Sequence, residues 1–270
     1  MRMTQTSIQE NLSRVRERIS RAASRVGRHP NEIALIAVSK TRPASAIRDA
    51  FEAGVRHFGE NRVQEWEGKH AATEGLAATW HLIGHLQSNK AARAARLFHS
   101  VDSVDDLALA QRLDRARGEA GIIGKLRVLI EVRVAQEETK SGVEIAQLPA
   151  LAETVAELPH LQLAGLMCIP PFFDPQSTVI SSEARNPSSL ASVDARLQST
   201  LREEGHRSSP SSHPVRPYFR RLRELRDNLT KRFGFDLPVL SMGMSHDFEV
   251  AIEEGATEVR IGTALFGPRL

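Results

Sequence analysis

The stretch IALIAVSKTRP, residues 33–43, is the part of the sequence that decides the fold. Its first six residues are apolar and rich in β-branched side chains, which is typical of a strand that is buried on both faces. The run stops at Ser39-Lys40, and Pro43 prevents the strand from simply continuing. A buried strand that ends on a lysine raises the question of what that lysine does.

Seven more short apolar runs follow along the chain, and helix-like segments separate them. We expect strands at 33–38, 55–58, 79–83, 98–101, 126–134, 161–169, 238–242 and 258–263. We expect helices at 43–53, 61–75, 88–96, 104–118, 145–157, 217–233 and 246–254, and an amphipathic helix at 7–27 ahead of the first strand. Eight strands that alternate with helices predict an α/β protein, a single closed (β/α)₈ TIM barrel with an extra N-terminal helix. An open doubly wound sheet is the alternative, because periodicity does not settle whether the sheet closes.

One segment, at about residues 176–216, departs from this alternation. It is rich in Ser, Arg and Pro, and it contains no run that would make a core strand. A connection of this length inside a compact domain is either functional or an insertion. Because it carries no constellation of chemical groups, we interpret it as an atypical loop insertion in one domain that spans residues 1–270.

The composition favours a soluble protein of the cytoplasm. The formal net charge is +3, and no apolar stretch approaches membrane-spanning length or forms a signal-peptide core. Arginines alternate with acidic residues along the expected helices, so we expect neither a membrane nor a nucleic-acid partner. The single cysteine, Cys168, excludes an internal disulfide, and in the apolar run LAGLMCI a buried thiol is favoured over a nucleophile.

In a barrel of this kind the functional groups lie at the C-terminal ends of the strands. The seventh and eighth expected strands lead into SMGMS and RIGTA, where this fold frequently holds a phosphate group. Gly243 and Gly262 let backbone amides approach an anion, and Ser245 and Thr263 add hydroxyl donors. Two ordinary strand-to-helix turns are the alternative, because Gly and Ser are common in such turns.

Lys40 lies beside these two loops if the barrel closes. Taken alone, a lysine at a strand end is most simply a side chain whose amine reaches solvent. Next to a phosphate site, however, a lysine amine suits a phosphorylated aldehyde, with which it can form a Schiff base. Pyridoxal 5′-phosphate (PLP) meets both requirements.

Arg260 is the second residue that PLP would explain. It precedes Gly262 by two residues, and its simpler role is an ion pair within the barrel. Facing the pyridine nitrogen of PLP, a guanidinium would donate a hydrogen bond without readily giving up its proton. That arrangement disfavours chemistry that needs a stabilised carbanion.

Other polar residues near strand ends are weaker candidates. His81 and His85 are four residues apart, but they pass from strand into loop and would not share a helix face. We therefore expect no metal site, and no motif indicates a catalytic residue. The stretch DSVDD predicts a helix start with Ser103 as the N-cap and Asp106 at the third helical position.

Six ordered motifs in the sequence resemble those of the pyridoxal phosphate homeostasis proteins, the YggS/PROSC family. They are IALIAVSKTRP, HFGENRVQE (57–65), WHLIGHLQSNK (80–90), GLMCIPP (165–171), LSMGMSHDFEVAI (240–252) and VRIGTALFG (259–267). The resemblance covers about residues 7–175 and 217–270. It implies a single (β/α)₈ barrel like the N-terminal domain of alanine racemase.

The resemblance also implies eight positions that bind the cofactor. They are Lys40, matching the lysine that holds PLP as an internal aldimine; Asn61 and Ile83, which line the ring; Arg260, at the pyridine nitrogen; and Met244, Ser245, Gly262 and Thr263 in the phosphate loops. The family is not known for enzymatic turnover. The resemblance thus implies a carrier or regulator in PLP homeostasis, with PLP-dependent apo-enzymes as candidate partners.

A PLP-dependent amino-acid racemase or decarboxylase is the alternative function. Alanine racemases resemble this fold but add a second domain and a tyrosine base. Here the chain ends at Leu270, soon after the eighth strand, and the only tyrosine is Tyr218, so no second base is evident. Without a further domain to supply a dimer surface, we expect a monomer.

Overall fold

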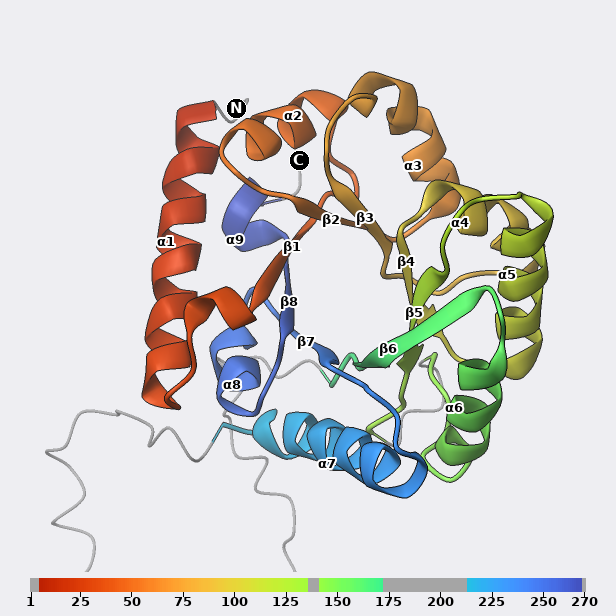
Figure 1. Cartoon of the computed structure of the whole chain (residues 1–270). Helices are drawn as coiled ribbons and strands as arrows, with labels where there is room; N and C mark the ends of the chain where they lie inside the picture. The colour runs from red at the N-terminus through yellow and green to blue at the C-terminus, as the bar shows by residue number, and fades with distance from the viewer. Residues whose placement is uncertain (1–4, 136–140, 172–212, 269–270) are drawn as a thin grey trace, which may run out of the picture.

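The computed structural model describes residues 5–135, 141–171 and 213–268 of the chain (Figure 1). Eight parallel strands form one closed barrel in chain order, so the predicted barrel is confirmed and the open sheet is excluded. The strands are β1 (Ala34–Val38), β2 (His57–Glu60), β3 (Thr79–Leu82), β4 (Ser100–Val104), β5 (Leu126–Glu131), β6 (Leu161–Met167), β7 (Val239–Met244) and β8 (Glu258–Ile261).

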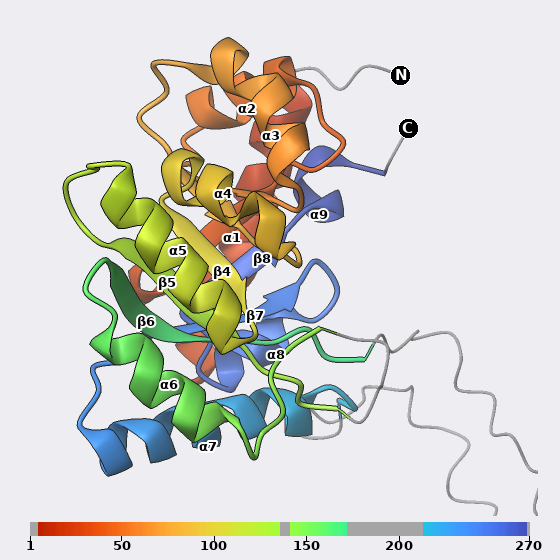
Figure 2. The ribbon, with the colours of Figure 1, turned by 90° about the vertical axis from the view of Figure 1, so that its right-hand side faces the viewer.

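Helices cover the outside of the barrel (Figure 2). They are α1 (Gln5–Arg25), α2 (Ala44–Glu52), α3 (Val63–His70), α4 (Ala91–Leu97), α5 (Leu107–Glu119), α6 (Leu148–Glu157), α7 (Arg216–Phe233), α8 (Phe248–Glu253) and α9 (Thr263–Phe266). Short 3-10 turns are η1 (Pro30–Glu32), η2 (Ala71–Thr73) and η3 (Ser88–Lys90). The predicted extra helix is α1, which packs against α2, α8 and α9.

The first strand is apolar on both faces because both faces are buried. Ala37 belongs to the core between the sheet and the helices, whereas Ile36 points the other way and its side chain approaches Gly59 of β2. Both residues are fully buried. An apolar run without alternation is what such a strand requires.

Closure of the barrel places the end of β1 between two other strand ends. Ala37 pairs with Ile261 of β8, and Val38 pairs with Gly59 of β2. Since all eight strands are parallel, their C-terminal ends lie at the same end of the barrel. We call this end the mouth.

Two strands, β2 and β4, each begin two residues later than predicted. The shift of β4 makes the predicted helix start wrong. Ser103 lies inside β4, where its hydroxyl donates to the Gly84 carbonyl at 2.7 Å. Asp106 is itself the N-cap of α5, and its carboxylate accepts from the Leu109 N–H at 2.7 Å.

Cys168 is fully buried, as its apolar surroundings in the sequence predicted. Burial raises the pKa of this thiol to about 12. A thiol is a nucleophile only as the thiolate, so Cys168 is part of the core and not a reactive group.

The predicted insertion at 176–216 lies almost wholly outside the described residues, and α7 begins at Arg216. Within the described part of the chain, no helix has the length and apolar character that crossing a membrane would require.

Gly165 of β6 allows a close approach between two strands in the barrel wall. It pairs with Val239 of β7, and a Cβ at position 165 would lie 2.0 Å from the Val239 carbonyl oxygen. We expect Gly165→Ala to lower the free energy of unfolding in urea by roughly 1–3 kcal/mol through overpacking. Gly68→Ala is the matched control, because position 68 is an exposed position of α3 with no atom within 4 Å of a new Cβ. Equal stability of the two variants would contradict the close packing of β6 on β7.

Candidate functional site

All eight predicted binding positions lie at the mouth of the barrel. Lys40 follows β1, Asn61 follows β2 and Ile83 follows β3, while Met244 ends β7 and Arg260 lies on β8; Ser245, Gly262 and Thr263 continue from β7 and β8. The strand order places β7, β8, β1, β2 and β3 side by side. The eight positions therefore form one contiguous arc and are not scattered around the barrel.

Backbone amides converge on one hydroxyl at the ends of β7 and β8. The Ser245 Oγ accepts from the Gly262 N–H at 3.3 Å and from the Ala264 N–H at 3.4 Å. Both contacts are long for hydrogen bonds of this type, so these amides would donate more strongly to an anionic oxygen. Thr263, between them, is exposed and offers a further hydroxyl.

The end of β7 can pass close to α8 only because residue 243 is glycine. Its φ is +91°, which L side chains rarely adopt, and a Cβ there would lie 2.5 Å from the Ala251 Cβ. Directly after it, the Met244 N–H donates to Asp247 at 2.6 Å. These two constraints fix the path of the chain into Ser245.

Arg260 is held in place by backbone oxygens. Its guanidinium donates to the Ser241 carbonyl at 2.8 Å, to the Ser241 Oγ at 2.9 Å and to the Cys168 carbonyl at 2.7 Å. The residue is 3% exposed, and the structure gives it no ion pair within the described ranges. The simpler expectation of an ion pair in the barrel is therefore not met among these residues. Arg260 presents a fixed cation to the interior of the mouth.

Lys40 occupies a strained turn. The Ser39 carbonyl accepts from the Arg42 N–H at 3.0 Å, so Lys40 and Thr41 are the two central residues of a four-residue turn. Thr41 has a φ of 62°, and among the described residues it is the one non-glycine residue with a positive φ. Turns of this form usually carry Gly or Asn at that position, and a left-handed conformation costs a β-branched residue about 1–2 kcal/mol.

Asn61 and Ile83 close the arc on the β2–β3 side. The Ile83 N–H donates to the Glu60 carbonyl at 2.9 Å, and the Ile83 side chain, which is buried, leans over Gly59. The Asn61 Oδ1 is buried and has no hydrogen-bond partner among the described residues. A buried amide oxygen of this kind is ready to accept a hydrogen bond from a bound group.

Two further polar side chains were not predicted: Asp105, directly after β4, and Glu131, at the end of β5. Glu131 is the last residue of β5; its Oε1 accepts from the Ser141 hydroxyl at 3.0 Å, and its Oε2 has no partner in the described part of the chain. Burial raises the pKa of Glu131, and repulsion from Asp105 adds to the rise. The signal was present in LRVLIE, a buried strand that ends on a charged residue just as β1 ends before Lys40.

A buried polar network inside the barrel links side chains of β3, β4, β5 and β8. His81 Nδ1 lies 3.1 Å from Asp102, and Arg127 donates to Glu258 across the barrel from β5 to β8. Ligand atoms of His81, Asp102 and Glu258 lie within 4.8 Å of one another, as a metal site would require. The Arg127 guanidinium, however, already contacts His81 at 3.5 Å and Glu258, and a cation there opposes a second one. The charges of the network are therefore paired with one another, although the buried Glu258 Oε2 has no hydrogen-bond partner among the described residues.

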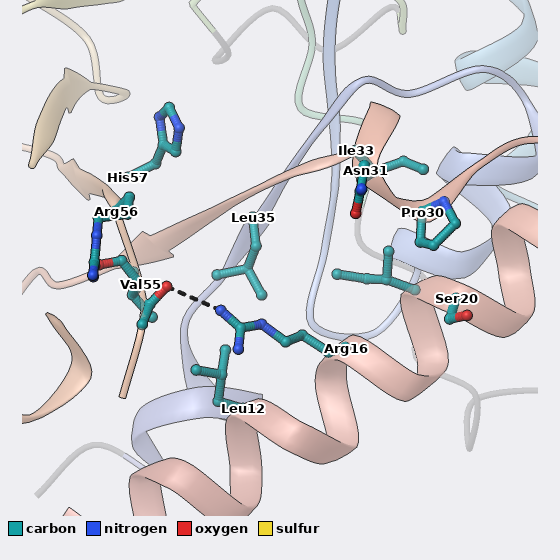
Figure 3. A pocket seen from close by; sticks show the side chains of 12 residues that line it. Leu12, Arg16, Ser20, Pro30, Asn31, Ile33, Leu35, Val55, Arg56 and His57 are labelled. Atoms are coloured by element: carbon teal, nitrogen blue, oxygen red, sulfur yellow. Dashed lines mark hydrogen bonds between the residues drawn. The ribbon is translucent and has the colours of Figure 1, made fainter. Parts of the chain in front are cut away.

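A pocket of about 510 Å³ lies between α1 and the beginnings of β1 and β2 (Figure 3). Leu12, Ile33 and Leu35 provide much of its wall, and Arg16 donates across it to the Gly54 carbonyl at 2.9 Å. None of the predicted binding positions lines it. Because it lies at the N-terminal ends of the strands, this pocket is not the predicted site.

The groups at the mouth fit a phosphorylated aldehyde with an aromatic ring. Amides and hydroxyls at Ser245 and Gly262 suit the phosphate, Lys40 on the adjacent strand supplies an amine, and the Asn61 oxygen and the Arg260 cation remain for polar atoms of the ring.

Comparison with known proteins identifies the family of this chain. The model of the alanine racemase N-terminal domain matches residues 10–269. A pyridoxal phosphate homeostasis protein of Aquifex aeolicus (strain VF5) is 44% identical over 260 residues, which cover 96% of this chain and 97% of that protein. The chain belongs to the pyridoxal phosphate homeostasis protein family. Relatives of the same name in other bacteria match over a similar share of the chain.

Two solved structures place the chain within this family and its wider fold. PipY of Synechococcus elongatus PCC7942, described with PLP bound, has a TM-score of 0.72 and 35% identity, and the match covers 96% of this chain and 100% of PipY. Alanine racemase from Corynebacterium glutamicum has a TM-score of 0.60 at 16% identity, which shows a shared fold alone, and the match covers 61% of that enzyme.

His57, whose Nδ1 lies 3.1 Å from the Nε2 of His81, extends the polar network and gives the protein a predictable acid sensitivity. Burial, with the charges of His81 and Arg127, lowers the pKa of His57 to about 4. In the unfolded chain this histidine takes up a proton near pH 6.5. Between pH 6.5 and 4 the unfolded chain therefore binds more protons than the folded chain, and the free energy of unfolding falls as the pH is lowered. We expect His57→Gln to reduce the loss of unfolding free energy between pH 7.5 and 4.5, measured by urea unfolding at each pH. The exposed-histidine control His70→Gln should keep the full loss, and an unchanged loss in His57→Gln would contradict the assignment.

Proposed function

We propose that this protein binds PLP at the mouth of its barrel, with Lys40 as the covalent attachment residue, and takes part in the homeostasis of this cofactor. The observation that carries the proposal is the convergence of the Gly262 and Ala264 amides on Ser245. These amides follow β8, which pairs with β1, the strand that leads into Lys40. The bound cofactor supplies an aldehyde that bonds reversibly to amines. The names of the relatives and the PLP-bound PipY structure support the same function.

Different residues of the chain bind different parts of the cofactor. Ser245, Gly262 and Thr263 hold the phosphate through hydroxyl and backbone donors, and Met244 sets the loop that precedes them. Lys40 provides the amine, while Asn61 and Ile83 bound the ring on the β2–β3 side. This division rests on the order of the strands, which places phosphate donors and amine on neighbouring strand ends.

The surroundings of Arg260 favour cofactor binding without catalysis. Three donated hydrogen bonds to fixed oxygens keep the guanidinium in place and charged. A group that does not readily release its proton leaves the ring nitrogen it faces unprotonated, and such a ring stabilises carbanions poorly. We therefore propose a carrier or regulator without evident turnover.

The proposed role also suggests a cellular compartment and an oligomeric state. A carrier that keeps a reactive aldehyde bound serves PLP-dependent apo-enzymes, which are soluble proteins, and we propose that it acts in the cytoplasm as a monomer. Neither a membrane nor a nucleic acid is needed for this role.

Reduction with borohydride tests the attachment residue. In the wild-type protein loaded with PLP, we expect reduction to fix the cofactor on the peptide that contains Lys40, detected by peptide mass. Lys40→Met should lose that label, because Lys40 follows the strand that pairs with β8 and so lies beside the phosphate donors. Lys125→Met, a change at an exposed lysine, should keep it. A label of wild-type yield in Lys40→Met would contradict the assignment.

Incubation with amino acids tests the absence of turnover. The PLP-loaded protein is mixed with each L-amino acid, and chirality and released CO₂ are followed over hours. We expect no rate above that of free PLP at the same concentration. Racemisation or decarboxylation at an enzyme's typical rate of about 1 s⁻¹ or more would favour the alternative of a racemase or decarboxylase.

A further inference from the structure

An ion network centred on Lys69 holds the residues on both sides of Lys40. Lys69 extends from α3, and its Nζ donates to the carbonyl of Ser39 at 3.0 Å, which is the residue directly before Lys40. The same Nζ donates to the carboxylate of Glu65 at 2.7 Å. Glu65 in turn accepts from the N–H of Thr41, the residue directly after Lys40. One ammonium group thus links both ends of the short segment that carries the lysine.

The network is anchored to the barrel wall and not only to α3. Lys69 also contacts both oxygens of Glu60, at 3.0 and 3.3 Å, and Glu60 is the fully buried last residue of β2. The Ser39 hydroxyl donates to the same Glu60 at 2.7 Å, and the Ser39 N–H donates to the Gly59 carbonyl at 3.0 Å. The start of the turn is therefore fixed to the adjacent strand by side-chain and backbone bonds.

The strain at Thr41 explains why the turn needs such a network. A threonine in the left-handed region favours another conformation, and it persists only where the surroundings over-determine it. The Glu65–Thr41 bond and the Lys69–Ser39 bond contribute to this, because they join the two ends of the turn through one ion pair. They act beside the Ser39 bonds to β2 and the bonds that Arg42 donates to the Gly267 and Pro268 carbonyls. Release of either end would let Thr41 leave the positive φ and carry Lys40 with it.

We propose that Lys69, with Glu60 and Glu65, is a positioning device that holds the Lys40 turn in its strained conformation and so presents the Lys40 amine to PLP. This inference rests on the proposed function of Lys40. Lys69 itself touches no bound group in this account; it acts through the backbone of Ser39 and Thr41.

The test combines removal of the network with relief of the strain. We expect Lys69→Met to weaken PLP binding about tenfold, measured by titration of the absorbance of the bound cofactor, and to lower the yield of Lys40 label after borohydride reduction at limiting PLP. A tenfold change corresponds to about 1.4 kcal/mol. Thr41→Gly alone should change affinity less than twofold, because glycine adopts the positive φ without strain.

The rescue by the double variant separates positioning from general stability. If Lys69 acts by holding the turn, Thr41→Gly in the Lys69→Met protein should restore affinity and label to within about threefold of the wild type. A network that merely fastens α3 to the barrel would give no rescue, because glycine at 41 adds no contact to α3. Lys125→Met controls for the loss of a lysine charge.

A second pair of variants keeps the inference testable if Lys69→Met does not fold. Glu65→Ala removes the acceptor of the Thr41 N–H at a side chain that is 25% exposed, and it should show the same loss and the same rescue by Thr41→Gly. Wild-type affinity in Lys69→Met or Glu65→Ala, or a double variant as weak as the single one, overturns the inference. The wild-type label is mapped first: absence of label from Lys40 overturns the proposed function and this inference together, whereas label on Lys40 with unaffected variants overturns this inference alone.

Discussion

The pairing of β1 with β8 is the constraint on which the candidate site depends. Without it, the strand that carries Lys40 and the strand that carries Arg260 and Gly262 would be the distant first and last members of a sheet. With it, Ala37 and Ile261 are hydrogen-bonded neighbours, and the residues that follow each strand lie at one mouth. Two hundred and more residues of intervening chain serve to bring these two ends together, and each helix–strand unit advances the sheet by one position until it closes.

The interior of the barrel is divided between stability and binding. Toward the N-terminal ends, His81 pairs with Asp102 and Arg127 pairs with Glu258, whose Oε2 has no hydrogen-bond partner among the described residues. Although burial works against it, His81 and Arg127 hold the pKa of Asp102 below its usual range. Toward the mouth, polar atoms such as the Asn61 Oδ1 and the Glu131 Oε2 have no partner among the described residues. Buried charges that are paired with one another are tolerated in the fold, and removal of one partner would leave the other uncompensated. Polar atoms at the mouth that lack a protein partner are available to a ligand.

Much of this arrangement could be predicted from the sequence, and the failures have a common cause. Apolar runs such as IALIAV predicted all eight strands, because a strand buried on both faces has a local signature. Ser103 was misplaced because SVDSV, which forms β4, is a buried strand with polar residues whose partners, Gly84 and Arg127, come from other strands. Lys69 was missed for the same reason: only its contact with Glu65 is local, whereas Ser39 lies 30 residues away. Sequence patterns record local burial, but the pairing of polar side chains across a barrel becomes visible only once the barrel closes.

A crystal structure of the protein with PLP tests most directly whether Lys40 and the loops after β7 and β8 form the binding site. It would show where the phosphate lies and which lysine is joined to the cofactor. We expect continuous density from the Lys40 Nζ to the ring, with phosphate oxygens within hydrogen-bonding distance of the Gly262 and Ala264 amides. Density joined to another lysine, or a phosphate bound in the pocket between α1 and β1, would contradict it.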